Sequence, residues 1–234
     1  MNWKMKIKMT KGIILLSGGL DSLVSLALAK EEFNIELALT FDYGQKSVKQ
    51  EIFASKNICD HYKIQHKVIE LPWLKEITQT SLVSETEIPA VVFEDLNSSK
   101  FVENSAKSVW VPNRNGLFLN IAGCFADSYG YDYVVFGANK EEGQTFPDNT
   151  QGFIDSVTKE FEYSTQNRPK VVAPLINLVK NDIVKSAIEH SVPLELTRSC
   201  YSNREKNCGV CESCVRLKSA LENNNCHNLI KVLF

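Results

Sequence analysis

A buried strand that runs directly into a glycine turn and then a helix is the feature that most restricts this fold. Residues 12–16 (GIILL) form a short apolar run, as expected for a strand buried on both faces. Ser17, Gly18 and Gly19 interrupt this run. Residues 20–30 then carry apolar side chains at helical spacing. The unit predicts a turn at which the N-terminus of a helix is free to meet an anion.

The sequence that follows predicts further strand and helix units. Residues 35–41 and 63–71 are predicted to be strands, and residues 47–61 between them a helix. Strands that alternate with helices require right-handed crossovers, which lay the strands parallel to one another. We therefore predict a Rossmann-like α/β fold, an open parallel sheet with helices on both faces.

The rest of the chain is expected to continue this alternation after one irregular stretch. Residues 76–108 are rich in Ser, Thr, Glu and Asn without a sustained period, which predicts a long loop or lid. Asn177 is a candidate N-cap for a late helix. We expect a main domain over residues 1–195, with residues 196–234 as a small segment packed on it that holds one short helix. The other predicted elements are helices 113–128, 151–161 and 178–190 and strands 133–136 and 171–174.

Composition and charge narrow the class of protein. Hydrophobic residues make up 44% and charged residues 23% of the chain, as in soluble globular proteins. The net charge of -2 argues against a nucleic-acid backbone as a stable partner. No apolar run approaches the ~18 residues that span a membrane. The four lysines within residues 1–11 are expected to form a solvated arm, and the protein is expected to be cytoplasmic.

The turn after the first strand has the properties of a phosphate-binding loop. Its two glycines let the backbone approach a phosphate without a Cβ clash, and the helix that follows presents free N–H groups. Two serine hydroxyls add donors, and Asp21 suits a magnesium ion or a helix cap. The pattern is neither a Walker A loop nor the dinucleotide motif G-x-G-x-x-G. The candidate ATP-binding residues are Leu16, Ser17, Gly18, Gly19, Leu20, Asp21 and Ser22.

Four of the seven cysteines fall within fifteen residues near the end of the chain. An odd number of cysteines without a secretory signal argues against a disulfide framework. The spacing C-x7-C-x2-C-x2-C suits a closed, structural zinc site. An iron–sulfur cluster is the alternative, because spacing alone does not choose the metal. The candidate metal ligands are Cys200, Cys208, Cys211 and Cys214.

Residues 17–22 (SGGLDS), directly after a buried strand, resemble the pyrophosphate loop (PP-loop) of the ATP pyrophosphatase superfamily. Members of that superfamily adenylate a substrate and release pyrophosphate. With further motifs in the same order, nearly the whole chain resembles the 7-cyano-7-deazaguanine synthase family, which makes a nitrile precursor of the tRNA bases queuosine and archaeosine. These motifs are residues 40–45 (TFDYGQ), residues 111–120 (VPNRNGLFLN), Gly137, residues 146–148 (FPD) and the ending CGxCxxC.

The resemblance implies an ATP-dependent C–N ligase that converts 7-carboxy-7-deazaguanine and ammonia into a nitrile. One ATP would adenylate the carboxylate, ammonia would form the amide, and a second activation would dehydrate that amide. The implied cofactors are ATP, magnesium and structural zinc, and the implied assembly is a homodimer.

The resemblance also implies roles for single residues. Asp21, Arg114 and Asp148 are the expected catalytic residues: Arg114 would clamp a phosphate or carboxylate, and Asp148 would contact the base edge or magnesium. Some of the expected substrate residues follow a strand end, where ligands bind in open α/β sheets, although ordinary turn chemistry explains Asp42 equally well. The expected substrate-binding residues are Asp42, Tyr43, Gln45, Asn113 and Arg114.

Three alternatives remain open at the level of sequence. Residues 139–150 depart from the common bacterial pattern of the family, which allows an amine other than ammonia, such as a protein amine, as the acceptor. A PP-loop tRNA thiolase shares the loop but normally has an additional RNA-binding domain and a more basic surface. A zinc module for nucleic acid would use the basic residues near the cysteines, but it leaves the phosphate loop unexplained.

Overall fold

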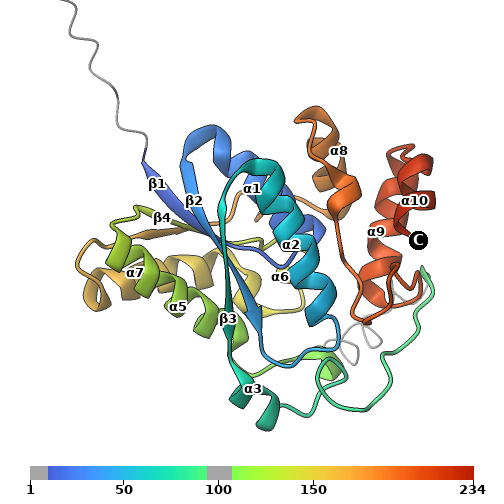
Figure 1. The fold of residues 1–234 in the computed structure, drawn as a ribbon, viewed down its shortest axis with the longest axis horizontal. Helices are drawn as coiled ribbons and strands as arrows, with labels where there is room; N and C mark the ends of the chain where they lie inside the picture. The colour runs from blue at the N-terminus through green and yellow to red at the C-terminus, as the bar shows by residue number, and fades with distance from the viewer. Residues whose placement is uncertain (1–9, 94–106) are drawn as a thin grey trace, which may run out of the picture.

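The computed structural model describes residues 10–93 and 107–234, and Figure 1 shows a central sheet with helices on both sides. Within these residues the sheet has five strands in the order β3-β2-β1-β4-β5, and every neighbouring pair is parallel. The predicted open parallel α/β sheet is therefore confirmed. The strands are β1 (Lys11–Leu15), β2 (Asn34–Asp42), β3 (Gln65–Glu70), β4 (Tyr133–Val135) and β5 (Lys170–Val172).

The helices form two layers that bury opposite faces of the sheet. One layer packs α1, α2, α8, α9 and α10 into a single hydrophobic cluster, and the other packs α5 and α7 into a second cluster. The principal helices are α1 (Leu20–Glu32), α2 (Val48–Tyr62), α5 (Arg114–Tyr129), α7 (Gln151–Ser164), α8 (Lys180–Glu189), α9 (Glu212–Asn223) and α10 (His227–Leu233). The shorter ones are α3 (Pro72–Glu76), α6 (Lys140–Gly143) and the 3-10 turns η2 (Pro147–Asn149) and η3 (Leu194–Leu196).

The position of the central strand β1 explains the continuous apolar run at residues 12–16. Ile13 and Ile14 are neighbours in the chain, both are completely buried, and they belong to the two different clusters. Successive side chains of a strand point to opposite faces, so a strand covered by helices on both sides needs apolar residues at every position.

The C-terminal segment differs from the sequence prediction in its helix content. It holds two helices, α9 and α10, where one short helix was expected. Leu217 and Leu221 of α9 lie in the same buried cluster as residues of α1. The segment thus packs on the layer that carries the start of α1.

The predicted cap at Asn177 is wrong. Helix α8 begins at Lys180, its N-cap residue is Val179, and no side chain caps it. The chain forms a turn before the helix, in which the N–H of Leu178 donates to the carbonyl oxygen of Leu175 at 2.9 Å. Asn177 lies within that turn, too early in the chain to cap α8.

The predicted loop over residues 76–108 is only partly described. Residues 77–93 have turns and irregular backbone, and residues 94–106 lie outside the described residues. The prediction is wrong at its two ends, because Glu76 is the last residue of α3 and residues 107–109 are helical. Among the helices of the described residues, none is long and apolar enough to cross a lipid bilayer.

Candidate active site and metal centre

The phosphate loop lies at the point where the chain changes direction along the sheet. From β1 the chain adds β2 and β3 on one side, and later β4 and β5 on the other. Ligands of open α/β sheets bind in the crevice outside the strand ends at such a switch point. Gly137, just beyond β4, lies so close to the start of α1 that an added Cβ would come within 3.1 Å of the Ser22 nitrogen.

The loop is tightly folded and leaves the start of α1 open. Gly18 has a φ of +77°, and a Cβ there would approach the Cβ of Ala54 to 2.7 Å. The hydroxyl of Ser22 donates to the carbonyl oxygen of Gly19 at 3.1 Å and accepts from the N–H of Ser17 at 3.3 Å. No side chain caps α1. Its first N–H groups therefore remain available to an anion.

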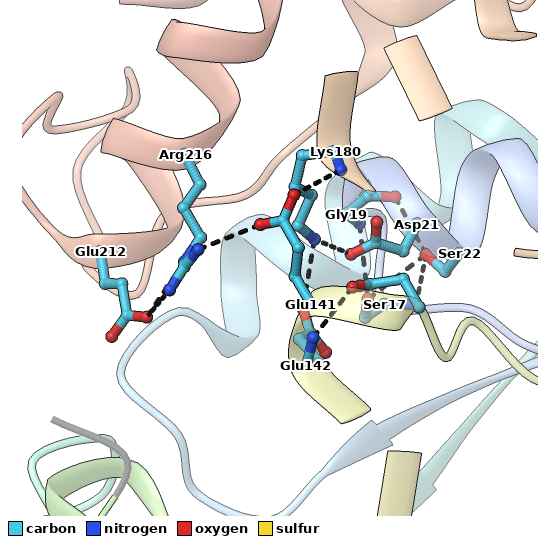
Figure 2. Close-up of polar contacts among 10 residues, drawn as sticks. Ser17, Gly19, Asp21, Ser22, Glu141, Glu142, Lys180, Glu212 and Arg216 are labelled. Atoms are coloured by element: carbon cyan, nitrogen blue, oxygen red, sulfur yellow. Dashed lines mark hydrogen bonds and ion pairs between the residues drawn. The ribbon is translucent and has the colours of Figure 1, made fainter. Parts of the chain in front are cut away.

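Lys180 joins two carboxylates beside this loop, as Figure 2 shows. Its Nζ pairs with Asp21 Oδ2 and lies 3.1 Å from Glu142 Oε1. Burial raises the pKa of Asp21 to about 6, against the opposing attraction of Lys180. Burial alone would lower the pKa of Lys180, but the two carboxylates outweigh it and raise that pKa. The ammonium group thus stays charged at the edge of the phosphate loop.

A second charged group links the C-terminal segment to the same site. Arg216 of α9 pairs with Glu141 at 3.0 Å and with Glu212 at 2.9 Å (Figure 2). Glu141 also accepts a hydrogen bond from the backbone N–H of Lys180 at 2.7 Å. Helices α6, α8 and α9 therefore share one network of ion pairs beside the loop.

Two adjacent cavities open between these elements. The larger, of about 250 Å³, extends from the phosphate loop past Lys180 and Arg114 to Tyr201 of the C-terminal segment. The smaller, of about 120 Å³, lies beside it and is lined by Asp148. Arg114, Glu142, Lys180 and Tyr201 line both cavities. Together they offer a site with a phosphate-binding end and a second compartment.

The structure brings the three expected catalytic residues around these cavities. Asp21 and Arg114 line the larger one, and Arg114 and Asp148 line the smaller one. Burial raises the pKa of Asp148, while Arg114 opposes this effect. Their catalytic roles stay predictions.

The expected ATP-binding residues surround the phosphate end. Leu16, Ser17, Gly19, Leu20 and Ser22 line the larger cavity together with Asp21, and Gly18 lies within the same turn.

The expected substrate residues are distributed less evenly. Tyr43 lines the larger cavity, and its hydroxyl accepts a hydrogen bond from Arg114 at 3.2 Å. Asp42 accepts from the N–H of Gly44 at 3.0 Å, as an ordinary turn residue does.

Gln45 is buried, and its side chain forms hydrogen bonds with the backbone of Tyr43 and Phe41. Asn113 has a φ of 49° and precedes α5. Of these four residues, only Tyr43 lines either cavity, so the substrate roles of the others stay predictions.

Sequence reasoning missed Lys180, Glu142 and Arg216. None of them belongs to a motif with a recognisable spacing, and Lys180 lies far along the chain from Asp21. An acidic pair at residues 141–142 was visible in the sequence, but nothing local indicated the cation it meets.

The four candidate metal ligands come together as expected from their spacing. The Sγ atoms of Cys200, Cys208, Cys211 and Cys214 all lie within 4.8 Å of one another, and those of Cys208 and Cys214 are 3.8 Å apart. A tetrahedral ion with metal–sulfur bonds of about 2.3 Å places its sulfurs roughly 3.8 Å apart. The donor set and its spacing therefore fit a single metal ion.

Comparison with known proteins identifies the group to which this site belongs. The family model described as "Queuosine biosynthesis protein QueC" matches residues 11–225. The chain belongs to this family. The 7-cyano-7-deazaguanine synthase of Methanosarcina mazei is 52% identical to this chain over 217 residues, which cover 91% of this chain and 94% of that protein.

A relative from a second organism is similar to about the same extent. The 7-cyano-7-deazaguanine synthase of Carboxydothermus hydrogenoformans is 51% identical, over 92% of this chain and 100% of its own length. Among solved structures, a U34-tRNA thiolase from Methanococcus maripaludis has a TM-score of 0.49 and 18% identity, over 96% of this chain and 70% of that one. That likeness is too distant to assign chemistry.

Proposed function

We propose that this chain converts 7-carboxy-7-deazaguanine and ammonia to 7-cyano-7-deazaguanine, with ATP as the activating substrate. The proposal is supported by membership of the QueC family and by relatives named 7-cyano-7-deazaguanine synthase that are 52% and 51% identical to this chain. The observation that carries it is the convergence of the phosphate loop, Lys180 and Arg114 on one cavity, beside which lies a second cavity that shares Arg114 and Lys180.

The first chemical step is an adenylation. An oxygen of the substrate carboxylate attacks the α-phosphorus of ATP, and pyrophosphate leaves with the bonding electrons. Negative charge grows on the leaving group, so fixed positive groups at that position lower the barrier. The free N–H groups of α1 and the ammonium of Lys180 occupy the phosphate end and would supply this stabilisation. Arg114 would hold the carboxylate in line.

Magnesium fits one position in this arrangement. Asp21 Oδ1 is buried and has no hydrogen-bond partner among the described residues, although Oδ2 is paired with Lys180. A buried, unpaired carboxylate oxygen is costly unless a cation or donor meets it. Asp21 would therefore hold magnesium, which as a hard cation prefers oxygen ligands and would neutralise charge on the phosphates.

The later steps use the same groups. Ammonia attacks the acyl carbon and displaces AMP, which leaves the amide. A second ATP then activates the amide oxygen, and loss of AMP with the nitrogen protons gives the nitrile. Transfer to a protein amine is not favoured, since relatives of this similarity carry the synthase name.

A direct assay tests the proposal. Purified protein is mixed with ATP, magnesium, ammonium and 7-carboxy-7-deazaguanine, and products are read by mass spectrometry. We expect the nitrile and two AMP per nitrile, both absent in Asp21→Ala and unchanged in Asp155→Ala, whose side chain is exposed on α7. AMP without nitrile would contradict the nitrile-forming step, and no AMP at all would overturn the whole proposal.

We further infer that the four-cysteine site holds zinc. The sulfurs are as close as a single tetrahedral ion requires, whereas an iron–sulfur cluster lies between its cysteines and spreads them farther apart. Elemental analysis of the purified protein should give one zinc per chain. A visible absorption band with stoichiometric iron would refute zinc. In Cys214→Ser the bound metal should be lost, while in Cys124→Ser, an exposed thiol on α5, it should be retained.

A homodimer, a cytoplasmic location and the lack of a stable nucleic-acid partner remain predictions. Light scattering at several protein concentrations tests the dimer. A gel-shift titration with tRNA at physiological salt tests the third, and a saturable shift below micromolar protein would contradict it.

A further inference from the structure

The smaller cavity has an unusual combination of wall residues. Trp110 and Phe146 face each other with nearly parallel rings, at a centroid distance of 6.1 Å and an angle of 11°. Both line the cavity, and Trp110 is exposed although it is a large aromatic residue. Flat aromatic faces in a cavity wall favour a flat ligand that stacks on them.

The charged residues of this cavity fall into two groups. Three carboxylates are already engaged: Glu142 with Lys180, and Glu141 and Glu212 with Arg216. Asp148 differs from them. Its recorded side-chain partner is the amide of Asn149 at 3.1 Å, and the described residues give it no ion pair.

Arg114 is the matching cation at the other end. It lines both cavities, and its side chain donates to Tyr43 at 3.2 Å and to Asn115 at 3.4 Å. The described part of the chain gives it no carboxylate within ion-pair distance. Arg114 and Asp148 therefore bring opposite charges to the same compartment, where they attract each other although the described residues give neither of them an ion pair.

We propose that the smaller cavity is the site for the deazapurine ring, with Asp148 as the residue that selects a guanine-type edge. The proposal rests on the function proposed above. A 7-deazaguanine ring offers two adjacent donors, the ring N1–H and the 2-amino group, and a carboxylate accepts both in bidentate fashion. The 7-carboxylate lies on the other ring, away from this edge, and so points toward Arg114 and the ATP cavity. The rings of Trp110 and Phe146 provide the stacking faces.

The turn at residues 146–149 holds the side chains that would contact the ring. The 3-10 turn η2 begins at Pro147, and Asn149 is buried. Asn149 donates to Asp148, which fixes the carboxylate direction. Phe146, directly before this turn, and Asp148 within it therefore present a stacking face and a hydrogen-bond acceptor from neighbouring positions. A ring bound there would stack on Phe146 with its face and donate hydrogen bonds to Asp148 from its edge.

Binding of two ligands tests this assignment without relying on turnover. The probes are 7-carboxy-7-deazaguanine and its analogue without the 2-amino group, measured by calorimetry in the presence of a non-hydrolysable ATP analogue. The wild-type chain should bind the amino ligand about 10-fold or more tightly than the analogue, since hydrogen bonds to a charged group are the strong ones. Asp148→Asn should bind the amino ligand at least about 10-fold more weakly and lose most of the preference. Phe146→Leu should weaken both ligands alike, because stacking does not read the amino group.

Controls separate this inference from the proposed function and from a folding defect. Asp155→Asn changes an exposed carboxylate of α7 and should leave both affinities unchanged. Asp148→Asn should keep the wild-type affinity for the ATP analogue. Equal affinity of the wild type for the two ligands would overturn the inference even if the nitrile is made. A loss of magnesium-dependent ATP binding in Asp148→Asn would overturn it in favour of a metal-binding role. No binding of either ligand by the wild type would instead overturn the proposed function itself.

Discussion

The backbone N–H of Arg198 donates to the carbonyl oxygen of Gly18 at 2.7 Å. This hydrogen bond connects the residue just before the cysteine cluster to the middle of the phosphate loop. The Arg198 side chain is buried and donates to the carbonyl oxygens of Ser202, Arg204 and Glu205. The cysteine loop is thus fastened to the phosphate loop through one residue.

Arg198→Lys should weaken both loops together. A lysine ammonium cannot reproduce the planar fork that reaches three carbonyl oxygens, so most of these hydrogen bonds would be lost. We expect the free energy of unfolding to fall by about 2–3 kcal/mol and the affinity for ATP to fall with it, measured by denaturant titration and calorimetry.

Arg204→Lys is the matched control for that substitution. Its side chain is exposed and only its backbone carbonyl serves as an acceptor, so both quantities should stay at the wild-type value. A normal ATP affinity in Arg198→Lys would show that the cysteine loop does not support the phosphate loop.

Gly137→Ala should separate β4 from the start of α1. An added Cβ would lie 3.1 Å from the nitrogen and 3.2 Å from the Cα of Ser22, and backbone atoms cannot move aside as a side-chain end can. We expect a loss of about 1–3 kcal/mol in the free energy of unfolding and weaker ATP binding, because the phosphate loop would shift.

Gly152→Ala serves as the comparison, since a Cβ at that helical position meets nothing within 4 Å. It should leave ATP binding unchanged and stabilise the chain by a few tenths to 1 kcal/mol. Equal stability of the two alanine variants would contradict the steric explanation.

Lys180→Met tests the ion-pair network of the phosphate end. It leaves Asp21 and Glu142 close together without their cation, so the free energy of unfolding should fall by about 3 kcal/mol at pH 7.5. The loss should be smaller near pH 5, where the carboxylates take up protons. Thermal unfolding at both pH values measures this, with the exposed Lys185→Met as control. A loss independent of pH would contradict the electrostatic account.

The raised pKa of Asp21 predicts a specific dependence of stability on pH. In the folded chain the pKa is about 6, compared with 3.8 for the free side chain, so the folded state binds the proton more tightly. Its contribution to the free energy of unfolding is therefore fully present below pH 3.8 and is lost as the pH rises through about 6. Denaturant titrations without magnesium should show this slope in the wild type but not in Asp21→Asn. The same slope in Asp21→Asn would assign it to other groups.

The features that could be predicted from the sequence are those determined by residues close together in the chain. The apolar run at residues 12–16 and the glycines after it predicted β1 and the loop, because burial on two faces and a tight turn both act within a few residues. The cysteine cluster was predictable for the same reason. Its four ligands are close in sequence, so their spacing was enough to predict that their sulfur atoms lie together.

Other features depended on contacts between distant parts of the chain. Lys180 follows two apolar residues at a helix start, and nothing nearby indicates that it meets Asp21. Helix α10 is only seven residues long and is held by tertiary contacts: Asn207 donates to the carbonyl oxygen of Leu233 through its backbone and its side chain. Such short helices have little stability of their own, so periodicity does not reveal them.

The position of the C-terminal segment has a consequence for the protein during its synthesis. The wall of the larger cavity includes Arg198, Tyr201, Ser213 and Leu217, while its floor is the phosphate loop near the start of the chain. A growing chain can assemble β1 to β5 before these wall residues leave the ribosome, since all five strands precede them. The nascent polypeptide then carries a phosphate loop without its wall or its hydrogen bond to Arg198. The wall of the larger cavity is therefore complete only after Leu217 has been synthesised and has left the ribosome.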